Sequence, residues 1–250
     1  MKTKFKWARS GRTALPAAIL LTGVLTMASA TAGIITVPGT ANIFAAGQAS
    51  TSIIGSDGSV PPSISLEAGT TAIKFSSVTG TVHIGNPGNP AYGPESATLQ
   101  SAFFIGHPSL PVSDLNIDRT GTSLWGTFLD DTTPTGAHPE SLDFTTGALG
   151  ISFASLSPTL RQTFFIGDGL TGTGSGSSQS FFVPAGATRL VLGVLDSVLP
   201  LNSHPGAAYY NNTGAFTVGY DLAAPVPEPG TWTLLLAGLG LIGLRAIRRV

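Results

Sequence analysis

Glycine and proline break the middle of the chain into short segments, and this punctuation restricts the fold more than any other feature. The sequence of 250 residues contains 32 glycines and 18 prolines. The segments between them are rich in Val, Ile, Phe and Thr, a composition typical of β-strands. We therefore predict short strands over residues 72–75, 81–84, 102–105, 163–166, 180–183, 189–195 and 215–221.

Between these segments, no stretch repeats its apolar residues with the period of a helix. Short strands separated by Gly/Pro turns favour an all-β fold of two packed sheets. We expect a single β-sandwich or jelly-roll domain over residues 33–225. Prolines within 86–95 predict a loop, because proline cannot donate to a strand ladder. The glycine- and serine-rich segment 169–180 predicts a long hairpin loop, with a domain boundary as the alternative.

The N-terminal segment has the three parts of a secretory signal peptide. Basic residues come first, an apolar run over 14–27 follows, and small residues then offer cleavage after Ala30 or after Ala32. We predict that residues 1–32 are a signal peptide, with a retained N-terminal anchor as the alternative. The basic residues of this segment are Lys2, Lys4, Lys6, Arg9 and Arg12.

The C-terminal segment, residues 226–250, also places three features in a fixed order. A Pro-Glu-Pro tripeptide is followed by an apolar run over 232–244 and then by a basic end. An apolar helix satisfies its own backbone groups in lipid, and arginines behind it favour the cytoplasmic side. We therefore predict a short transmembrane helix with the body of the protein outside. The key residues are Pro227, Glu228 and Pro229, then Arg245, Arg248 and Arg249.

This layout resembles the PEP-CTERM sorting signal of Gram-negative bacteria. The resemblance implies that an exosortase recognises the segment and processes the protein near the Pro-Glu-Pro tripeptide. The protein would be anchored in the inner membrane as a precursor and then reach the cell surface or the extracellular matrix. An ordinary C-terminal membrane anchor behind a proline-rich linker is the alternative interpretation.

Setting both ends aside reveals an acidic body. The chain has 12 basic and 13 acidic residues; eight basic residues lie in the two ends, whereas Glu228 is the one acid there. The body therefore carries 4 − 12 = −8 charges. Nucleic-acid binding needs clustered positive charge, so we exclude that class. Excess carboxylate suits calcium, and the absence of cysteine rules out disulfides and thiolate metal sites.

The sequence contains none of the usual catalytic motifs, such as H-E-x-x-H, a P-loop or a nucleophile elbow. Asp130 and Asp131 are adjacent, so along a strand their side chains would point to opposite faces. We predict that the protein is not an enzyme. A polysaccharide-processing enzyme that uses Asp130, Asp131, Glu140 or Asp143 remains the alternative of that class.

The best candidate site combines the end of one predicted strand with the start of the next. Asp196 ends the apolar segment 190–195, and Asn211 and Asn212 open the strand over 215–221. These residues would lie at the two ends of one connection, on the same side of the sandwich. Their carboxylate and amide oxygens are ligands that calcium uses. The alternative is a plain turn, since Asp and Asn also favour turns.

The segments FVPAGATRLVLGVLD and YYNNTGAFTV resemble the bacterial galactophilic lectin family, small jelly rolls that bind galactose through calcium. The resemblance implies that Asp196 and Asn211 bind both calcium and sugar and that Asn212 binds calcium through its side chain. It also implies main-chain carbonyl ligands from Tyr92 and Ala208. The family's His-Pro sugar contact matches His138-Pro139, with His107-Pro108 as the alternative. The connection before Asn211 is longer than in the family, and residues 114–160 have no clear equivalent.

These observations predict an exported protein of the exopolysaccharide or biofilm matrix. Its partners would be extracellular polysaccharide or galactose-like glycans, bound through Ca²⁺ without any chemical reaction. Before processing, it would also contact the exosortase and the inner membrane. The alternative is a structural or adhesion protein of the same fold that binds no sugar.

Overall fold

The computed structural model describes residues 31–54, 57–85, 90–95, 98–105, 110–197, 209–224 and 238–239. Residues Ala28–Val226 form one compact unit, and Met1–Met27 with Pro227–Val250 form another. Nearly all the described residues belong to the first unit, which consists of β-strands and three short 3-10 turns. The strands form two main sheets and one separate hairpin, so the predicted all-β sandwich is confirmed.

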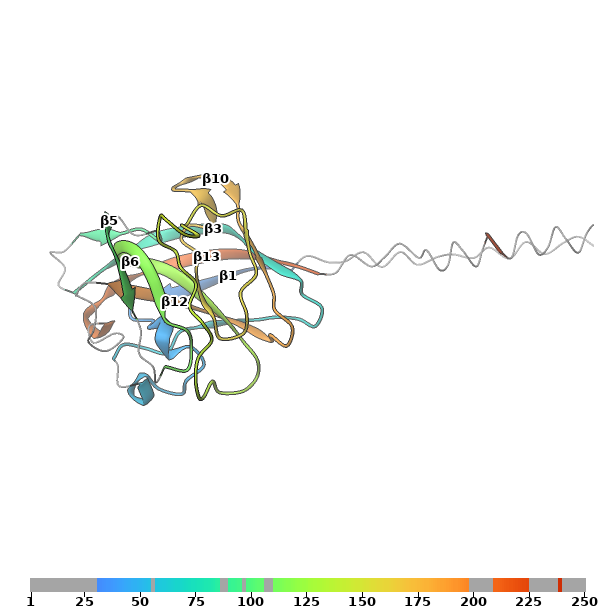
Figure 1. Ribbon diagram of the computed structural model, residues 1–250, viewed down its shortest axis with the longest axis horizontal. Helices are drawn as coiled ribbons and strands as arrows, with labels where there is room; N and C mark the ends of the chain where they lie inside the picture. Colours follow the sequence, from blue (N-terminus) through green and yellow to red (C-terminus); the bar gives the residue numbers. More distant parts are fainter. Residues whose placement is uncertain are drawn as a thin grey trace, which may run out of the picture. The chain divides into compact units, whose positions relative to one another are not determined.

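The first sheet is built around two long neighbouring strands, β13 and β3. β1 pairs with the other side of β13, and all three are antiparallel (Figure 1). Short strands complete the sheet beside β3, in the overall order β1-β13-β3-β11-β7, with β4 also on β3. The bounds are β1 Thr31–Pro38, β3 Ala72–His83, β4 Ala91–Tyr92, β7 Ser155–Leu156, β11 Ser180–Phe182 and β13 Thr213–Ala223.

The second sheet is centred on β12 and β6, which pair over nine consecutive positions from Arg189↔Leu129 to Ser197↔Gly121. Its order is β2-β12-β6-β5, with β8 also pairing with β6. The bounds are β2 Ser63–Ser65, β5 Thr98–Ile105, β6 Leu115–Leu129, β8 Thr163–Phe165 and β12 Arg189–Ser197. The separate hairpin joins β9 Leu170–Gly172 to β10 Ser175–Ser178, and the 3-10 turns are η1 Ile43–Ala45, η2 Thr51–Ile54 and η3 Tyr209–Asn211.

One hydrophobic core joins the two sheets. Phe181 of the first sheet stacks on Phe164 of the second, with ring centroids 5.2 Å apart, and also contacts Phe75 edge-on at 5.4 Å. Such aromatic pairs stabilise a core by about 0.5–1.5 kcal/mol beyond the area they bury. Most buried hydrophobic residues of both sheets belong to this one cluster, which confirms that the sheets pack face to face.

The apolar run of β12 is buried on both faces. Leu190, Leu192 and Val194 face the main core, whereas Val191 joins a smaller cluster on the other side of the sheet. Gly193 is required on that second side, because a Cβ there would lie 2.7 Å from the Ile43 Cα in η1. Burial on both faces explains why this strand reads as a continuous apolar segment.

Several strands differ from the sequence prediction. The segments predicted at 72–75 and 81–84 are parts of one strand, β3, and β1 and β6 were not predicted. β6 was missed because its first half is polar, including Asn116 and Asp118. The segment 169–180 was predicted as a long hairpin loop; it instead contains the paired short strands β9 and β10, and the flanking strands β8 and β11 belong to different sheets. The loop expected within 86–95 contains the two-residue strand β4, and residues 86–89 lie outside the described residues.

Candidate functional site

Asp196 lies at the end of the sandwich where β12 finishes and β13 begins. Its side chain follows the inward alternation of Leu190, Leu192 and Val194, so it points to the core side of the sheet. Thr122 of β6 is directly opposite Asp196 in the ladder, and directly paired residues point to the same face. The two oxygen-bearing side chains therefore lie side by side at the rim of the core.

We call the group formed by Asp196, Thr122, Asn211 and Asp57 the mouth site. Both carboxylate oxygens of Asp196, the Thr122 hydroxyl and the Asn211 side-chain oxygen are buried and lack a hydrogen bond of regular geometry in the described part of the chain, although the Asn212 side-chain amide interacts with the Asp196 carboxylate. Buried polar atoms almost always have a partner, so four such oxygens on residues at the same end of the sandwich call for an explanation. All four are oxygens, the atom type that hard cations prefer.

Burial also changes the charge state of Asp196. Burial raises the pKa of its carboxyl from 3.8 to about 6; the Asn212 amide acts in the opposite direction, and the nearby Asp57 carboxylate raises the pKa further. Keeping Asp196 ionised at neutral pH therefore costs about 3 kcal/mol in the folded protein. A bound cation would remove that cost, because an opposite charge favours the ionised form.

Tyr209 ties the η3 turn to both acidic residues. Its buried hydroxyl accepts a hydrogen bond from the Asp196 backbone N–H at 3.1 Å, and its own N–H donates to Asp57 Oδ1 at 2.8 Å. Burial raises the pKa of the Tyr209 phenol, and the Asp196 charge adds to this effect. The uncharged Tyr209 side chain thus holds the η3 turn, which contains Asn211, beside the end of β12.

Asn212 has a structural role in this arrangement. Its side-chain NH₂ donates to the Gly39 carbonyl at 3.0 Å, and its oxygen accepts from the Gly85 N–H at 3.3 Å. The residue is only 5% exposed, and both ends of its amide are used. The lectin resemblance implied that Asn212 binds calcium through its side chain. In the structure that side chain instead links the loops that contain Gly39 and Gly85.

Tyr92, predicted to offer a carbonyl, lies at the same end of the sandwich. Its neighbour Ala91 pairs with His83, which in turn pairs with Thr213 at the start of β13. The chain then crosses to the second sheet, where the Pro94 carbonyl accepts the Leu124 N–H at 2.8 Å. The loop that carries Tyr92 therefore bridges the sheets near Thr122. Ala208, the other predicted carbonyl ligand, lies outside the described residues.

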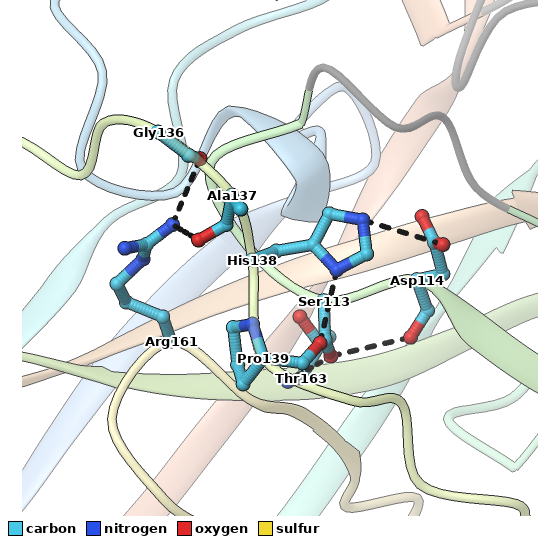
Figure 2. Close-up of polar contacts among 8 residues, drawn as sticks. All are labelled: Ser113, Asp114, Gly136, Ala137, His138, Pro139, Arg161 and Thr163. Atoms are coloured by element: carbon cyan, nitrogen blue, oxygen red, sulfur yellow. Dashed lines mark hydrogen bonds and ion pairs between the residues drawn. The ribbon is translucent and has the colours of Figure 1, made fainter.

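His138 belongs to a different group of polar contacts, which Figure 2 shows. Its Nε2 is 3.4 Å from Asp114 Oδ2, and its Nδ1 is 2.9 Å from the Pro139 carbonyl. Two backbone hydrogen bonds connect the segment before Asp114 to β6: the Ser113 N–H donates to the Arg161 carbonyl, and the Arg161 N–H donates to the Phe128 carbonyl. Phe128 pairs with Leu190, six residues and roughly 20 Å along β12 from Asp196. The structure does not bring His138 into the mouth site, and His107 lies outside the described residues.

Arg161 holds the loop that carries His138. Its Nε donates to the Pro111 carbonyl at 2.7 Å, and one terminal nitrogen donates to the carbonyls of Gly136 and Ala137 at 3.1 and 2.7 Å (Figure 2). The residue also has a φ of 67°, which is unfavourable for a side chain with a Cβ. The guanidinium contacts offset this local strain.

Replacing Arg161 should separate these two effects. Arg161→Ala loses the three contacts and keeps the strain, so we expect the free energy of unfolding to fall by about 1–3 kcal/mol. Arg161→Gly loses the same contacts but relieves the backbone, and should be more stable than Arg161→Ala by about 1 kcal/mol. Urea unfolding of both variants checks this. Equal stability of the two would show that the backbone is unstrained.

Two of the four carboxylates considered for an enzyme cap local turns. Asp130 Oδ1 accepts the Thr132 N–H at 2.9 Å and the Thr132 hydroxyl at 2.6 Å, and these hydrogen bonds lower its pKa. Asp143 Oδ1 does the same for Thr145, at 2.9 and 2.7 Å. Within the described ranges, no group of three or more His, Cys, Asp or Glu residues could hold a metal ion. A cation at the mouth site would therefore depend on neutral oxygens as well as carboxylates.

Sequence reasoning missed Thr122 and Asp57. Thr122 lies in the polar strand that was not predicted, and its pairing with Asp196 depends on a register between strands more than 70 residues apart in sequence. Asp57 lies in a loop, 152 residues from the Tyr209 N–H that it accepts. No local pattern in the sequence marks either residue.

Comparison with known proteins bears on the C-terminal segment. Residues 225–250 match the PEP-CTERM protein-sorting motif. The chain carries this motif. It indicates an exported, membrane-anchored precursor that an exosortase processes. The match covers the residues that were predicted to form the sorting signal, namely Pro227, Glu228 and Pro229 and the three C-terminal arginines. All of them lie outside the described residues.

No curated protein and no solved structure matched the chain, so the lectin resemblance of the body rests on its own residues. Of the predicted transmembrane run that belongs to the PEP-CTERM motif, only Gly238 and Leu239 are described, and both are helical. Among the described residues, no helix is long and apolar enough to cross a membrane.

Proposed function

We propose that the exported body is a calcium-dependent carbohydrate-binding module of the cell surface or extracellular matrix. The observation that supports it most is the set of buried oxygens without partners on Asp196, Thr122 and Asn211. Calcium binds six to eight oxygens, of which the protein would supply several and water or ligand the rest. Asp57 would add charge beside them without being the main ligand.

An exposed aromatic residue supports sugar as the ligand. Tyr210 lies between Tyr209 and Asn211 on η3, and 71% of it is exposed. Aromatic rings with one polar end suit surfaces that bind partly polar ligands. In this proposal, calcium holds two neighbouring sugar hydroxyls, and the Tyr210 ring covers the apolar face of the sugar. No proton is transferred, and no bond is broken.

The metal part of the proposal predicts a pH-dependent stabilisation by calcium. At pH 7.5 Asp196 is ionised, so saturation at about 100 times the Kd should raise stability by about 2.7 kcal/mol. Below pH 5 the carboxyl is protonated, because its pKa is about 6, and the stabilisation should largely disappear. Thermal unfolding of the body with calcium or with EDTA, at pH 7.5 and at a pH below 5, measures this. An unchanged melting temperature at pH 7.5 would rule out the metal site.

The sugar part is tested separately on a glycan array with calcium or EDTA. We expect binding that calcium permits, that Asp196→Ala abolishes, and that Tyr210→Ala weakens while leaving the calcium stabilisation intact. A blank array combined with a normal calcium response would favour the alternative function, a matrix scaffold stabilised by calcium.

A further inference from the structure

The predicted signal peptide ends in two overlapping cleavage sites, and only one of them overlaps β1, the first strand of the body. Ala28 and Ala30 are the small residues of the first site, and Ala30 and Ala32 are those of the second. β1 begins at Thr31. The first site therefore precedes the strand in the sequence, whereas the second site includes the first two residues of the strand.

The two residues that distinguish the sites, Thr31 and Ala32, are paired residues of the first sheet. β1 pairs antiparallel with β13 in one uninterrupted register that begins with Thr31 opposite Leu222. The Gly39 N–H donates to the Gly214 carbonyl, so the alternation of the ladder makes Thr31 and Leu222 a hydrogen-bonded pair. Leu222 is buried, and loss of Thr31 would leave its backbone N–H and carbonyl without a partner.

The bond that the second site would cut, Ala32–Gly33, lies beside a packed aromatic ring. A Cβ on Gly33 would lie 2.4 Å from the Tyr220 hydroxyl oxygen, so this ring covers the glycine. Tyr220 in turn packs against the main core. A peptidase reaches a paired segment only when the segment opens. Cutting this bond in the folded body therefore requires β1 to leave β13, whereas the Ala30–Thr31 bond precedes the paired residues.

We propose that a signal peptidase cuts after Ala30, that the mature chain begins at Thr31 with β1 complete, and that pairing of β1 with β13 closes the second site. The reaction is hydrolysis of one peptide bond. Water adds across the Ala30–Thr31 bond, which leaves a carboxylate on the leader and a free amine on the body. The signal peptide then ends at residue 30 instead of residue 32. This cleavage does not depend on calcium or sugar binding.

N-terminal sequencing of the protein from cells that export the full precursor tests this cleavage. We expect one sequence, Thr-Ala-Gly-Ile, which starts at Thr31, and no chain that starts with Gly-Ile-Ile at Gly33. A start at Gly33, a mixture of the two starts, or a chain that keeps its leader would overturn the proposal.

Two matched substitutions separate the sites, because each places a bulky residue in only one of them. Ala32→Phe blocks the second site alone, so processing to Thr31 should continue as in wild type. Ala28→Phe blocks the first site alone. Because β1 closes the second site, the Ala28→Phe precursor should accumulate with its leader attached. Efficient release of a chain that starts at Gly33 from this variant would show that β1 gives no protection, and would also overturn the proposal.

Opening β1 in the blocked precursor is the positive control. Ile35 pairs with Val218 in the ladder, and Ile35→Pro removes a backbone N–H from it. Adding Ile35→Pro to Ala28→Phe should therefore restore cleavage, now with a start at Gly33. If the double variant also keeps its leader, pairing of β1 is not what closes the second site, and the proposal fails.

Discussion

Asp196→Asn should make the calcium-free protein more stable at neutral pH, although it changes a residue of the proposed site. The carboxyl has a pKa of about 6 in the folded protein against 3.8 for the ordinary group, so the fold favours its neutral form. The stabilisation that the protonated Asp196 carboxyl gives to the folded protein is therefore complete below pH 4 and is lost as the pH rises through 6. Removing the charge should therefore raise the unfolding free energy by about 2–3 kcal/mol at pH 7.5 in EDTA.

The same variant should lose its response to calcium. If Asp196 binds calcium as proposed, wild type should gain stability when calcium is added and Asp196→Asn should not, so the stability difference between the two proteins should narrow or reverse. Chemical unfolding at pH 7.5 with EDTA or calcium gives the four values needed. Asp131→Asn, which makes the same change on an exposed loop carboxylate, should leave both values nearly unchanged. A loss of stability in EDTA would mean that the Asp196 charge is already compensated, which would remove the basis for the metal site.

Asn212→Ala should destabilise the protein strongly, with or without calcium. The substitution leaves the Gly39 carbonyl and the Gly85 N–H without their partner, and both glycines are buried. Two buried groups left unpaired cost about 2–4 kcal/mol, which is a large part of the stability of a typical domain. The melting temperature should fall by roughly 5–15 °C, as measured by calorimetry in EDTA.

The neighbouring residue supplies the matched control. Asn211→Ala removes a side-chain oxygen that has no partner of its own, so the calcium-free protein should change by less than about 1 kcal/mol. Its calcium response should nevertheless be lost. The two adjacent asparagines thus differ in opposite ways: one supports the fold and the other is a proposed ligand. The reverse pattern would assign the ligand role to Asn212, as the lectin resemblance implied.

Much of the fold could be predicted locally. The glycine and proline punctuation, with β-branched and aromatic segments between, predicted a sandwich, and β12 and β13 were found almost at their predicted bounds. Strands with polar faces were harder: β6 contains Asp118 and Arg119, and its strand character comes from pairing with β5 and β12. Composition cannot reveal such a strand, because its partners and not its own residues stabilise it.

The candidate site was likewise predictable in part from local sequence and in part not. Asp196, Asn211 and Asn212 were identified because residues at the two ends of one connection must lie near each other. Which asparagine is engaged depends on Gly39 and Gly85, more than 120 residues away along the chain, and no local rule distinguishes the two. His138 was suggested by a dipeptide, and its partner Asp114 comes from a different loop.

The sequence alone determined the export signal of the protein and its all-β fold class. The order of tripeptide, apolar run and arginines is linear information, which the match to the sorting motif also uses, and the pattern of turns and strands is set by local backbone preferences. Only the tertiary structure decided which oxygens are left without partners and which leader cleavage site overlaps a paired strand. Both depend on register between distant strands, where a shift of one residue would turn Thr122 away from Asp196.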